Sequence, residues 1–332
     1  MDDLLSGGLR QLLQDRCTPD AVRRIERGES PAALWAALEA SGFPDALVSE
    51  AQGGAGLALC DVFELFELCG THVVPVPLAE TILARGLLAS ARIERPAGSI
   101  ALALAHAASA GAIRCTNVPG GWVADWVLAQ RQGECLLLPV AQAATTPAVF
   151  PLDATLEWSA AAVASATRAA GTHDLQALQA CASAAQLAGA LMSVFTRTLQ
   201  YANERVQFGR PIGKFQAIQH QLAVLSEHAF AARMAAQIGC HADGCVPDRL
   251  RVAVAKARTS EAAVEVAALA HAIHSAIGFT AEYDLQLFTR RLHAWRQAGG
   301  SEGCWHGVLG QHVVHEHQGL ALDVLRATTN LH

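Results

Sequence analysis

The chain has 332 residues, of which 52% are hydrophobic and 16% are charged, so a large core can be buried. Its formal net charge of -6, without a basic stripe, excludes the usual nucleic-acid-binding classes. Nine cysteines without a CxxC pair indicate reduced thiols. The opening segment "MDDLLSGGLRQLLQDR" lacks the apolar stretch of a signal peptide, and polar residues interrupt the long apolar runs. We therefore expect a cytoplasmic protein that neither binds nucleic acid nor spans a membrane.

Residues 1–95 predict an N-terminal α-helical domain. One helix is expected between Ser30, a favourable N-cap, and Gly42, a favourable end. Apolar residues at helical spacing predict a second helix that ends at Gly70, and a third helix is expected to begin after Pro77.

Residues 96–170 change in character, because short apolar runs alternate with Gly, Pro and Asn, which predicts strands and a reduced β domain. Residues 171–332 return to helical patterns. The first has roughly 30 residues without proline, or about 45 Å of helix. Two more long helices are expected over 215–240 and 247–275, and a last one near Leu285. The predicted fold is mostly α, with a small central β domain and a C-terminal four-helix bundle.

Four fragments in this order resemble the acyl-CoA dehydrogenase family of flavoproteins over nearly the whole chain. They are "SEAQGGAGLALCDVFELFELCG", "VADWVLAQ", "YANERVQFGRPIGKFQAIQHQLA" and "HSAIGFTAEYDLQLFTRR". The resemblance implies FAD as cofactor and the α,β-dehydrogenation of an acyl-CoA thioester. It also implies an electron-transfer flavoprotein as the electron acceptor.

The third fragment carries the residues that the resemblance assigns to FAD. In the family its arginine contacts the diphosphate of an FAD held mainly by the neighbouring subunit, which here implies Arg205. The phenylalanine and a following glutamine, here Phe208 and Gln216, lie near the adenosine. Ser301 completes the predicted cofactor-binding set. The alternative for Arg205 is structural, with the guanidinium paired to Glu204 or capping a helix end.

The catalytic base departs from the family pattern. Family members use a carboxylate to abstract the α-proton while the β-hydrogen leaves as hydride. One position of that glutamate falls on Gly299, and the position used by other members falls on Gln179, beside Ala180. Neither side chain can accept the proton. Glu302 is the nearest carboxylate and the only catalytic candidate, although an exposed glutamate at a helix start is the alternative.

The cofactor loops also depart from the family pattern. The "QxxGG" segment reads "AIHSAIG", with Ala272 in place of glutamine and with Ser275 and Ala276 in place of the glycines. A Cβ at such positions can block the close approach of a cofactor. No loop like "TEPxxGSD" occurs in the shortened β region. The chain therefore retains one half of a FAD site and has lost parts of the other.

A half-site implies a partner that completes it. The segment "GFTAEYDLQLFTRR" is similar to the "GFTWEHDLHLYLRR" form of heteromeric family members that act on bulky, steroid-like or cyclic acyl-CoA thioesters. We expect one subunit of such an enzyme, with the FAD shared between subunits. Two alternatives stay open: a non-catalytic scaffold that only completes a partner's FAD and CoA sites, and a homo-oligomer.

Two further groups have no assigned chemistry. His312, His315 and His317 lie close together, but no acidic or cysteine ligand has matching spacing, so a solvated polar face is expected and no metal. Trp295 and Trp305 flank the position of Gly299, where they could line an acyl pocket or fill the core.

Overall fold

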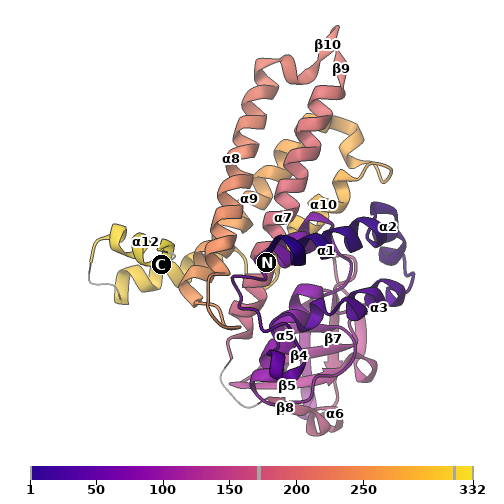
Figure 1. The fold of residues 1–332 in the computed structure, drawn as a ribbon, viewed down its shortest axis with the longest axis vertical. Helices are drawn as coiled ribbons and strands as arrows, with labels where there is room; N and C mark the ends of the chain where they lie inside the picture. The colour runs from indigo at the N-terminus through magenta and orange to yellow at the C-terminus, as the bar shows by residue number, and fades with distance from the viewer. Residues whose placement is uncertain (1, 170–172, 317–318, 331–332) are drawn as a thin grey trace.

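The computed structural model describes residues 2–169, 173–316 and 319–330. N-terminal helices, a region of two sheets and a bundle of long helices follow one another along the chain, which confirms the predicted fold class (Figure 1). The α-helices are α1 Asp2–Arg16, α2 Pro19–Glu26, α3 Ala32–Ser41, α4 Phe63–Thr71, α5 Leu78–Ser90, α6 Ala160–Ser165, α7 Leu175–Glu204, α8 Gln216–Gly239, α9 Arg249–His274, α10 Leu285–Gln297, α11 Glu302–Gln311 and α12 Ala321–Thr329.

The strands are β1 Ile100–Leu104, β2 His106–Ala107, β3 Ile113–Val118, β4 Trp126–Arg131, β5 Glu134–Pro139, β6 Ala144–Pro147, β7 Ala154–Trp158, β8 Thr167–Ala169, β9 Val206–Gln207 and β10 Arg210–Pro211. The short helical turns are η1 Phe43–Asp45, η2 Glu50–Gln52, η3 Ser109–Gly111, η4 Val140–Gln142, η5 Ile212–Lys214, η6 Ser275–Phe279 and η7 His312–Glu316.

Helix α3 matches the first predicted helix with one correction. Gly42 ends it in the left-handed conformation, with φ of 79°. The N-cap position is Pro31 rather than Ser30, and the Ser30 hydroxyl accepts a hydrogen bond from the Ala32 backbone at 3.3 Å. Ser30 therefore supports the helix start from one residue further out.

Helix α4 ends at Thr71, so the predicted end at Gly70 is confirmed to within one residue. A Cβ on Gly70 would lie 1.8 Å from the carbonyl oxygen of Gln186 on α7. A Cβ on Gly189 of α7 would lie 1.9 Å from the carbonyl oxygen of Glu67 on α4. The two glycines therefore let α4 and α7 cross in backbone contact, a packing role of Gly70 that sequence analysis did not predict.

Two sheets form the β region. Strands β1, β4, β5 and β8 make one four-stranded sheet, in which β1 and β4 are parallel, and strands β2, β3, β7 and β6 make the second. Along β1, Ala101 and Ala103 join the core between the sheets, whereas Ile100 and Leu102 join the core shared with the helices. This alternation of side chains attaches the β region to the helical body on one face.

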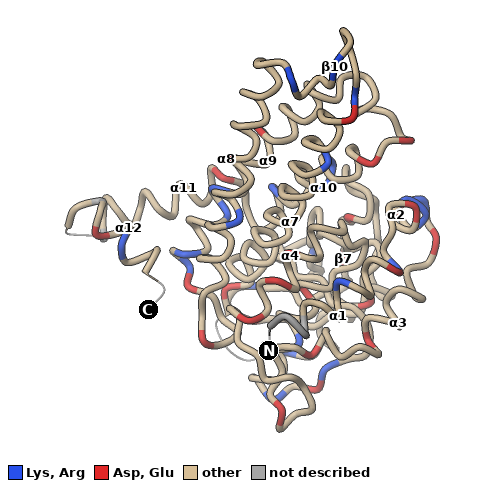
Figure 2. The backbone as a smooth tube through the Cα atoms, turned by 45° about the horizontal axis from the view of Figure 1, so that its top comes forward, with Lys and Arg blue, Asp and Glu red and all other residues tan. Residues whose placement is uncertain are grey.

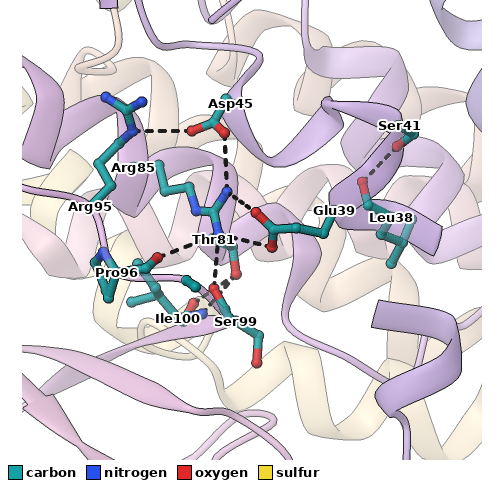
Figure 3. A network of polar contacts seen from close by, with 12 residues as sticks. Leu38, Glu39, Ser41, Asp45, Thr81, Arg85, Arg95, Pro96, Ser99 and Ile100 are labelled. Carbon is teal, nitrogen blue, oxygen red and sulfur yellow. Dashed lines mark hydrogen bonds and ion pairs between the residues drawn. The ribbon is translucent and has the colours of Figure 1, made fainter. Parts of the chain in front are cut away.

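Arg85 of α5 fixes the N-terminal helices to the start of β1 (Figure 3). Its buried guanidinium donates to Glu39 at 2.7 and 3.0 Å, to Asp45 at 3.1 Å and to the Gly98 carbonyl at 3.1 Å. Thr81, one turn earlier on α5, accepts a hydrogen bond from the Ile100 backbone at 2.8 Å. A buried arginine is stable only with such paired, charge-assisted partners.

Helix α7 is the centre of the bundle and contacts α4, α8, α9 and α10. Its 30 residues include many buried Ala, Gly, Cys and Ser side chains, which allow close helix packing. The predicted long helices are confirmed as α8 and α9, within two residues at each end. Acidic and basic residues are interspersed over the molecule (Figure 2).

Two described segments are long and apolar enough to cross a membrane by length and composition alone. They are Leu175–Glu204 and Arg249–Phe279, and 83% and 44% of their apolar windows are buried inside the protein. The core position of α7 accounts for the apolar character of the first segment.

Candidate functional site

A cavity of about 560 Å³ lies between the β region and the turn that joins α10 to α11. The lining residues come mainly from five parts of the chain: the end of β1, the end of β3, the loop from β6 to β7, the start of α7, and the end of α10 with the turn that follows it. They are Leu102, Ala103, Leu104, His106, Thr116, Asn117, Val118, Pro119, Ala148, Val149, Phe150, Asp153, Gln179, Ala294, Gln297, Ala298, Gly299 and Gly300.

The structure brings Gly299 and Gln179 together at this cavity, although they are 120 residues apart in the sequence. Gly299 has φ of 68°, and a Cβ there would lie 2.6 Å from the backbone nitrogen of Ala180. The Gln179 amide donates to the Leu102 carbonyl at 2.9 Å. The first position therefore cannot hold a longer side chain without moving α7, and the second is used to join α7 to β1.

Glu302 is the first residue of α11 and does not line the cavity. Both of its carboxylate oxygens accept hydrogen bonds from Arg296, one of them at 2.9 Å. These hydrogen bonds are the main cause of its pKa lying below the ordinary value. Ser301 is the N-cap residue of α11 but its side chain makes no capping hydrogen bond, and it also lies outside the cavity lining.

Buried side chains form hydrogen bonds to the backbone of the turn at Gly299. The indole nitrogen of buried Trp305 donates to the Gly299 carbonyl at 3.1 Å. The ammonium of buried Lys256 donates to the Trp295 and Arg296 carbonyls at 2.9 and 2.8 Å, and so caps the end of α10. Burial lowers the pKa of Lys256 to about 7. Trp305 therefore serves the core and the turn, not an acyl pocket.

A polar cluster that sequence analysis missed lies beside the cavity. Glu80 of α5, Gln186 of α7, Arg291 of α10 and Asp153 line a second cavity of about 20 Å³. Burial raises the pKa of Glu80 to about 7 and that of Asp153 to about 6. Asp153 also lines the larger cavity. These residues come from four distant segments and share no motif, so no local pattern marks them.

The predicted FAD-contacting residues lie at the other end of the bundle, on and beside the hairpin β9–β10 (Figure 1). Phe208 is 92% exposed at the hairpin turn, and Arg205 and Gln216 are exposed on either side of the hairpin. Arg205 occupies the C-cap of α7, but within the described residues its guanidinium makes no hydrogen bond or ion pair. Glu204 instead accepts from Gln200 at 2.8 Å.

The segment 272–278 shows a strained backbone where the family pattern has glycine. Ser275 has φ of 58° and ψ of -144°, a conformation that favours glycine. Ala272, together with His271 and Phe279, lines an open groove. The backbone at Ser275 thus keeps a conformation that favours glycine, whereas the side chains of Ser275 and Ala276 occupy space that two glycines would leave open to a cofactor.

The histidine group carries no metal site in the part of the chain that the structure describes. Among those residues, no three His, Cys, Asp or Glu side chains are placed to hold a metal ion. His312 and His315 lie in the turn η7, and His317 lies outside the described residues.

Glu80 predicts a specific dependence of stability on pH. Its raised pKa means that the folded protein binds more protons than the unfolded protein between about pH 4.5 and 7, so unfolding free energy falls as pH rises through this window. The nearby Asp153 carboxylate also raises the pKa of Glu80, whereas the Arg291 guanidinium lowers it. As the pH rises from 5 to 8, the unfolding free energy of Glu80→Gln should therefore increase by roughly 2–3 kcal/mol relative to that of the wild type.

Urea unfolding at pH 5 and pH 8 measures this difference, with Glu227→Gln on the exposed face of α8 as the control. An equal pH dependence in Glu80→Gln and the wild type would show that Glu80 titrates normally.

Comparison with known proteins supports one family. The model of the family "Acyl-CoA dehydrogenase, C-terminal domain" matches residues 177–313. Acyl-CoA dehydrogenase IpdE2 of Mycolicibacterium smegmatis is 32% identical over 307 residues, which cover 90% of this chain and 94% of the relative. The ChsE4-ChsE5 complex from Mycobacterium tuberculosis contains a chain with a TM-score of 0.80 and 23% identity, and the match covers 95% of this chain and 98% of that chain.

A Tcur3481-Tcur3483 steroid ACAD variant gives a TM-score of 0.78 at 24% identity, over 94% of this chain and 97% of that chain. Below 25% identity, these two structures establish the fold alone. The match to IpdE2 at 32% identity covers nearly the whole length of both chains. The chain therefore belongs to the acyl-CoA dehydrogenase family.

Proposed function

We propose that this chain is one subunit of a heteromeric, FAD-dependent acyl-CoA dehydrogenase that acts on a bulky cyclic acyl-CoA thioester. The observation that carries the proposal is the separation of two half-sites by α7. Gln179, at the cavity, and Arg205, at the hairpin, are 26 residues apart along this helix, which corresponds to about 39 Å. One extended dinucleotide cannot reach both, so each half-site needs a complement from another chain. We propose that this other chain is not an identical copy, because Gly299 stands at the position of the base and a Cβ at Ser275 opposes close approach of a cofactor.

The hairpin fits the diphosphate and adenosine part of FAD. Arg205 offers an unpaired guanidinium, which suits bidentate contact with a diphosphate, and Phe208 offers an exposed flat ring. The segment around Ser275 does not fit a second such contact, because a Cβ stands where close approach is needed. FAD, when bound, supplies the acceptor for the hydride from the β-carbon, and we propose that the partner holds most of it.

A second candidate function is a non-catalytic subunit that completes its partner's site. The geometry at Gly299 favours it, because the Ala180 backbone leaves no room for a carboxylate there. Gln179 and Glu302 are engaged with Leu102 and Arg296. In either case we propose a cytoplasmic complex whose electrons pass to an electron-transfer flavoprotein. The bulky substrate class rests on the likeness to steroid ACAD subunits.

The test is purification of the full chain alone and together with a second acyl-CoA dehydrogenase-like protein from the same source. We expect the chain alone to bind little FAD and the complex to be yellow, with a flavin absorption spectrum. A stoichiometric yellow protein obtained from this chain alone would contradict the heteromeric assembly. Absence of any complex would leave the homo-oligomer as the assembly.

Arg205→Ala should weaken retention of FAD by the complex about ten- to a hundredfold, because a charge-assisted bond to a diphosphate contributes roughly 1.5–3 kcal/mol. Arg205→Lys should recover only part of the FAD retention, since an ammonium cannot reproduce the planar, bidentate geometry of the guanidinium. Absorbance after dilution and ultrafiltration measures the loss.

The matched control is Arg210→Ala on the same hairpin. The Arg210 guanidinium lies 4.2 Å from the ring centroid of Phe215, so it is already engaged within the chain. We expect a smaller loss of FAD for Arg210→Ala. Equal losses in the two variants would mean that the hairpin acts through its overall positive charge.

Glu302→Gln should leave the dehydrogenation rate of the assembled enzyme within a few-fold of the wild type. The reason is that Glu302 is paired with Arg296 and lies outside the cavity lining. The effect is measured as the turnover rate of the complex on an acyl-CoA thioester. A loss of about a hundredfold or more, the usual scale for a general base, would make Glu302 catalytic.

A further inference from the structure

Two buried cysteines lie in contact where α7 packs against the end of α8. Cys181 belongs to the first third of α7, and Cys240 is the C-cap residue of α8. Their sulfur atoms are 3.4 Å apart, and both residues are 0% exposed. Because the two sulfurs of a disulfide are about 2.05 Å apart, each sulfur would have to move by less than about 1 Å to form one.

Helix packing fixes the position of both thiols. The Cys181 thiol donates to the Gly239 carbonyl at 3.5 Å. A Cβ on Gly239 would lie 2.5 Å from the Cβ of Ala255, so this glycine lets the end of α8 approach α9 closely. Two thiols held in contact have a high effective concentration, which favours a disulfide between them over a disulfide with a separate molecule.

The buried pair is shielded from direct attack by a soluble oxidant. The hydrogen bond with Cys181, together with burial, raises the pKa of Cys240 well above its ordinary value. Since the thiolate is the nucleophile in disulfide exchange, a buried thiol with a raised pKa reacts slowly. Oxidation of the pair therefore needs a more accessible thiol as its point of entry.

An exposed cysteine lies beside the pair, in the turn that precedes α4. This residue is Cys60. Its backbone nitrogen donates to the Ala242 carbonyl at 3.4 Å, and that of Leu59 donates to the Gly244 carbonyl at 2.9 Å, so the turn lies against the segment that follows Cys240. Cys60 is also close enough to contribute to the raised pKa of Cys240. A soluble disulfide therefore meets Cys60 before the buried pair.

We propose that Cys60, Cys240 and Cys181 form a thiol relay that ends in a buried disulfide between Cys181 and Cys240. The oxidant is a low-molecular-weight disulfide, RSSR, of which oxidised glutathione is an example. This inference is independent of the proposed acyl-CoA activity.

The relay consists of three thiol–disulfide exchanges. The Cys60 thiolate attacks RSSR, which gives a mixed disulfide and releases the first RSH. The Cys240 thiolate attacks the sulfur of Cys60 and releases the second RSH. The Cys181 thiolate then attacks the sulfur of Cys240, and Cys60 leaves as a thiol. In total, the pair loses two electrons and two protons, and RSSR is reduced to two RSH.

The cross-link has a measurable consequence for stability. It would join α7 to α8 at the end of the bundle opposite the hairpin β9–β10, and would close the segment 181–240 into a loop. A closed loop restricts the unfolded chain, so the urea midpoint of the oxidised protein should rise by roughly 0.5–1 M.

The experiment treats the full chain, as purified, with oxidised glutathione and then alkylates the remaining thiols in denaturant. We expect two of the nine thiols to be lost, and peptide mass spectrometry should find Cys181 joined to Cys240. Cys60→Ala should form the same disulfide at least about tenfold more slowly. Cys115→Ala, a buried cysteine of β3, is the control and should react at the wild-type rate.

Cys181→Ala removes the last step, so the relay should stop at a disulfide between Cys60 and Cys240. If this variant does not fold, the peptide map of the wild-type chain and the rate of Cys60→Ala decide alone. Recovery of all nine thiols, or glutathione that stays on Cys60 as the end product, would overturn the relay. Equal rates in Cys60→Ala and the wild type would overturn entry through Cys60.

Discussion

The straight length of α7 is the constraint on which the other features depend. The helix needs close neighbours along most of its 30 residues, and Gly70 and Gly189 provide the closest of these approaches by letting α4 touch its backbone. A packed helix of about 45 Å cannot bend to bring its ends together. The residues that line the cavity and the hairpin β9–β10 therefore lie near opposite ends of α7, and Figure 1 shows the hairpin at the far end of the bundle from the β region. This separation is the reason why we propose two different composite sites.

The loss of the base at Gly299 is built into the packing rather than being a single missing side chain. The glycine lies against Ala180 of α7, Trp305 holds its carbonyl, and Lys256 caps the preceding helix. A glutamate introduced at this position would have to displace the backbone of the central helix. Placing a carboxylate at this position thus requires several coordinated changes, which the proposed division of labour between two subunits would avoid.

Sequence analysis predicted what local patterns determine. The long helices, the stop at Gly42 and the change to strands follow from periodicity and turn residues, and the structure confirms them. The assignment of Arg205 and Phe208 to FAD followed from one contiguous motif, and their contact with FAD stays a prediction. The packing role of Gly70 was missed because a glycine near a helix end can also allow a close crossing, and only the tertiary contact with Gln186 reveals this. The Glu80 cluster was missed because four elements assemble it.

The same cluster shows how packing sets the charge of buried groups. Burial raises the pKa of Glu80 to about 7 and that of Asp153 to about 6, because the charged forms lose their solvent. The Arg291 guanidinium lowers both pKa values and also donates to Glu26 of α2 at 3.3 Å. One buried guanidinium on α10 therefore couples carboxyl groups from α2, from α5 and from the loop before β7. Removing it would leave Glu26 with fewer partners, so the protonation state of the cluster depends on how all of these elements pack around α7.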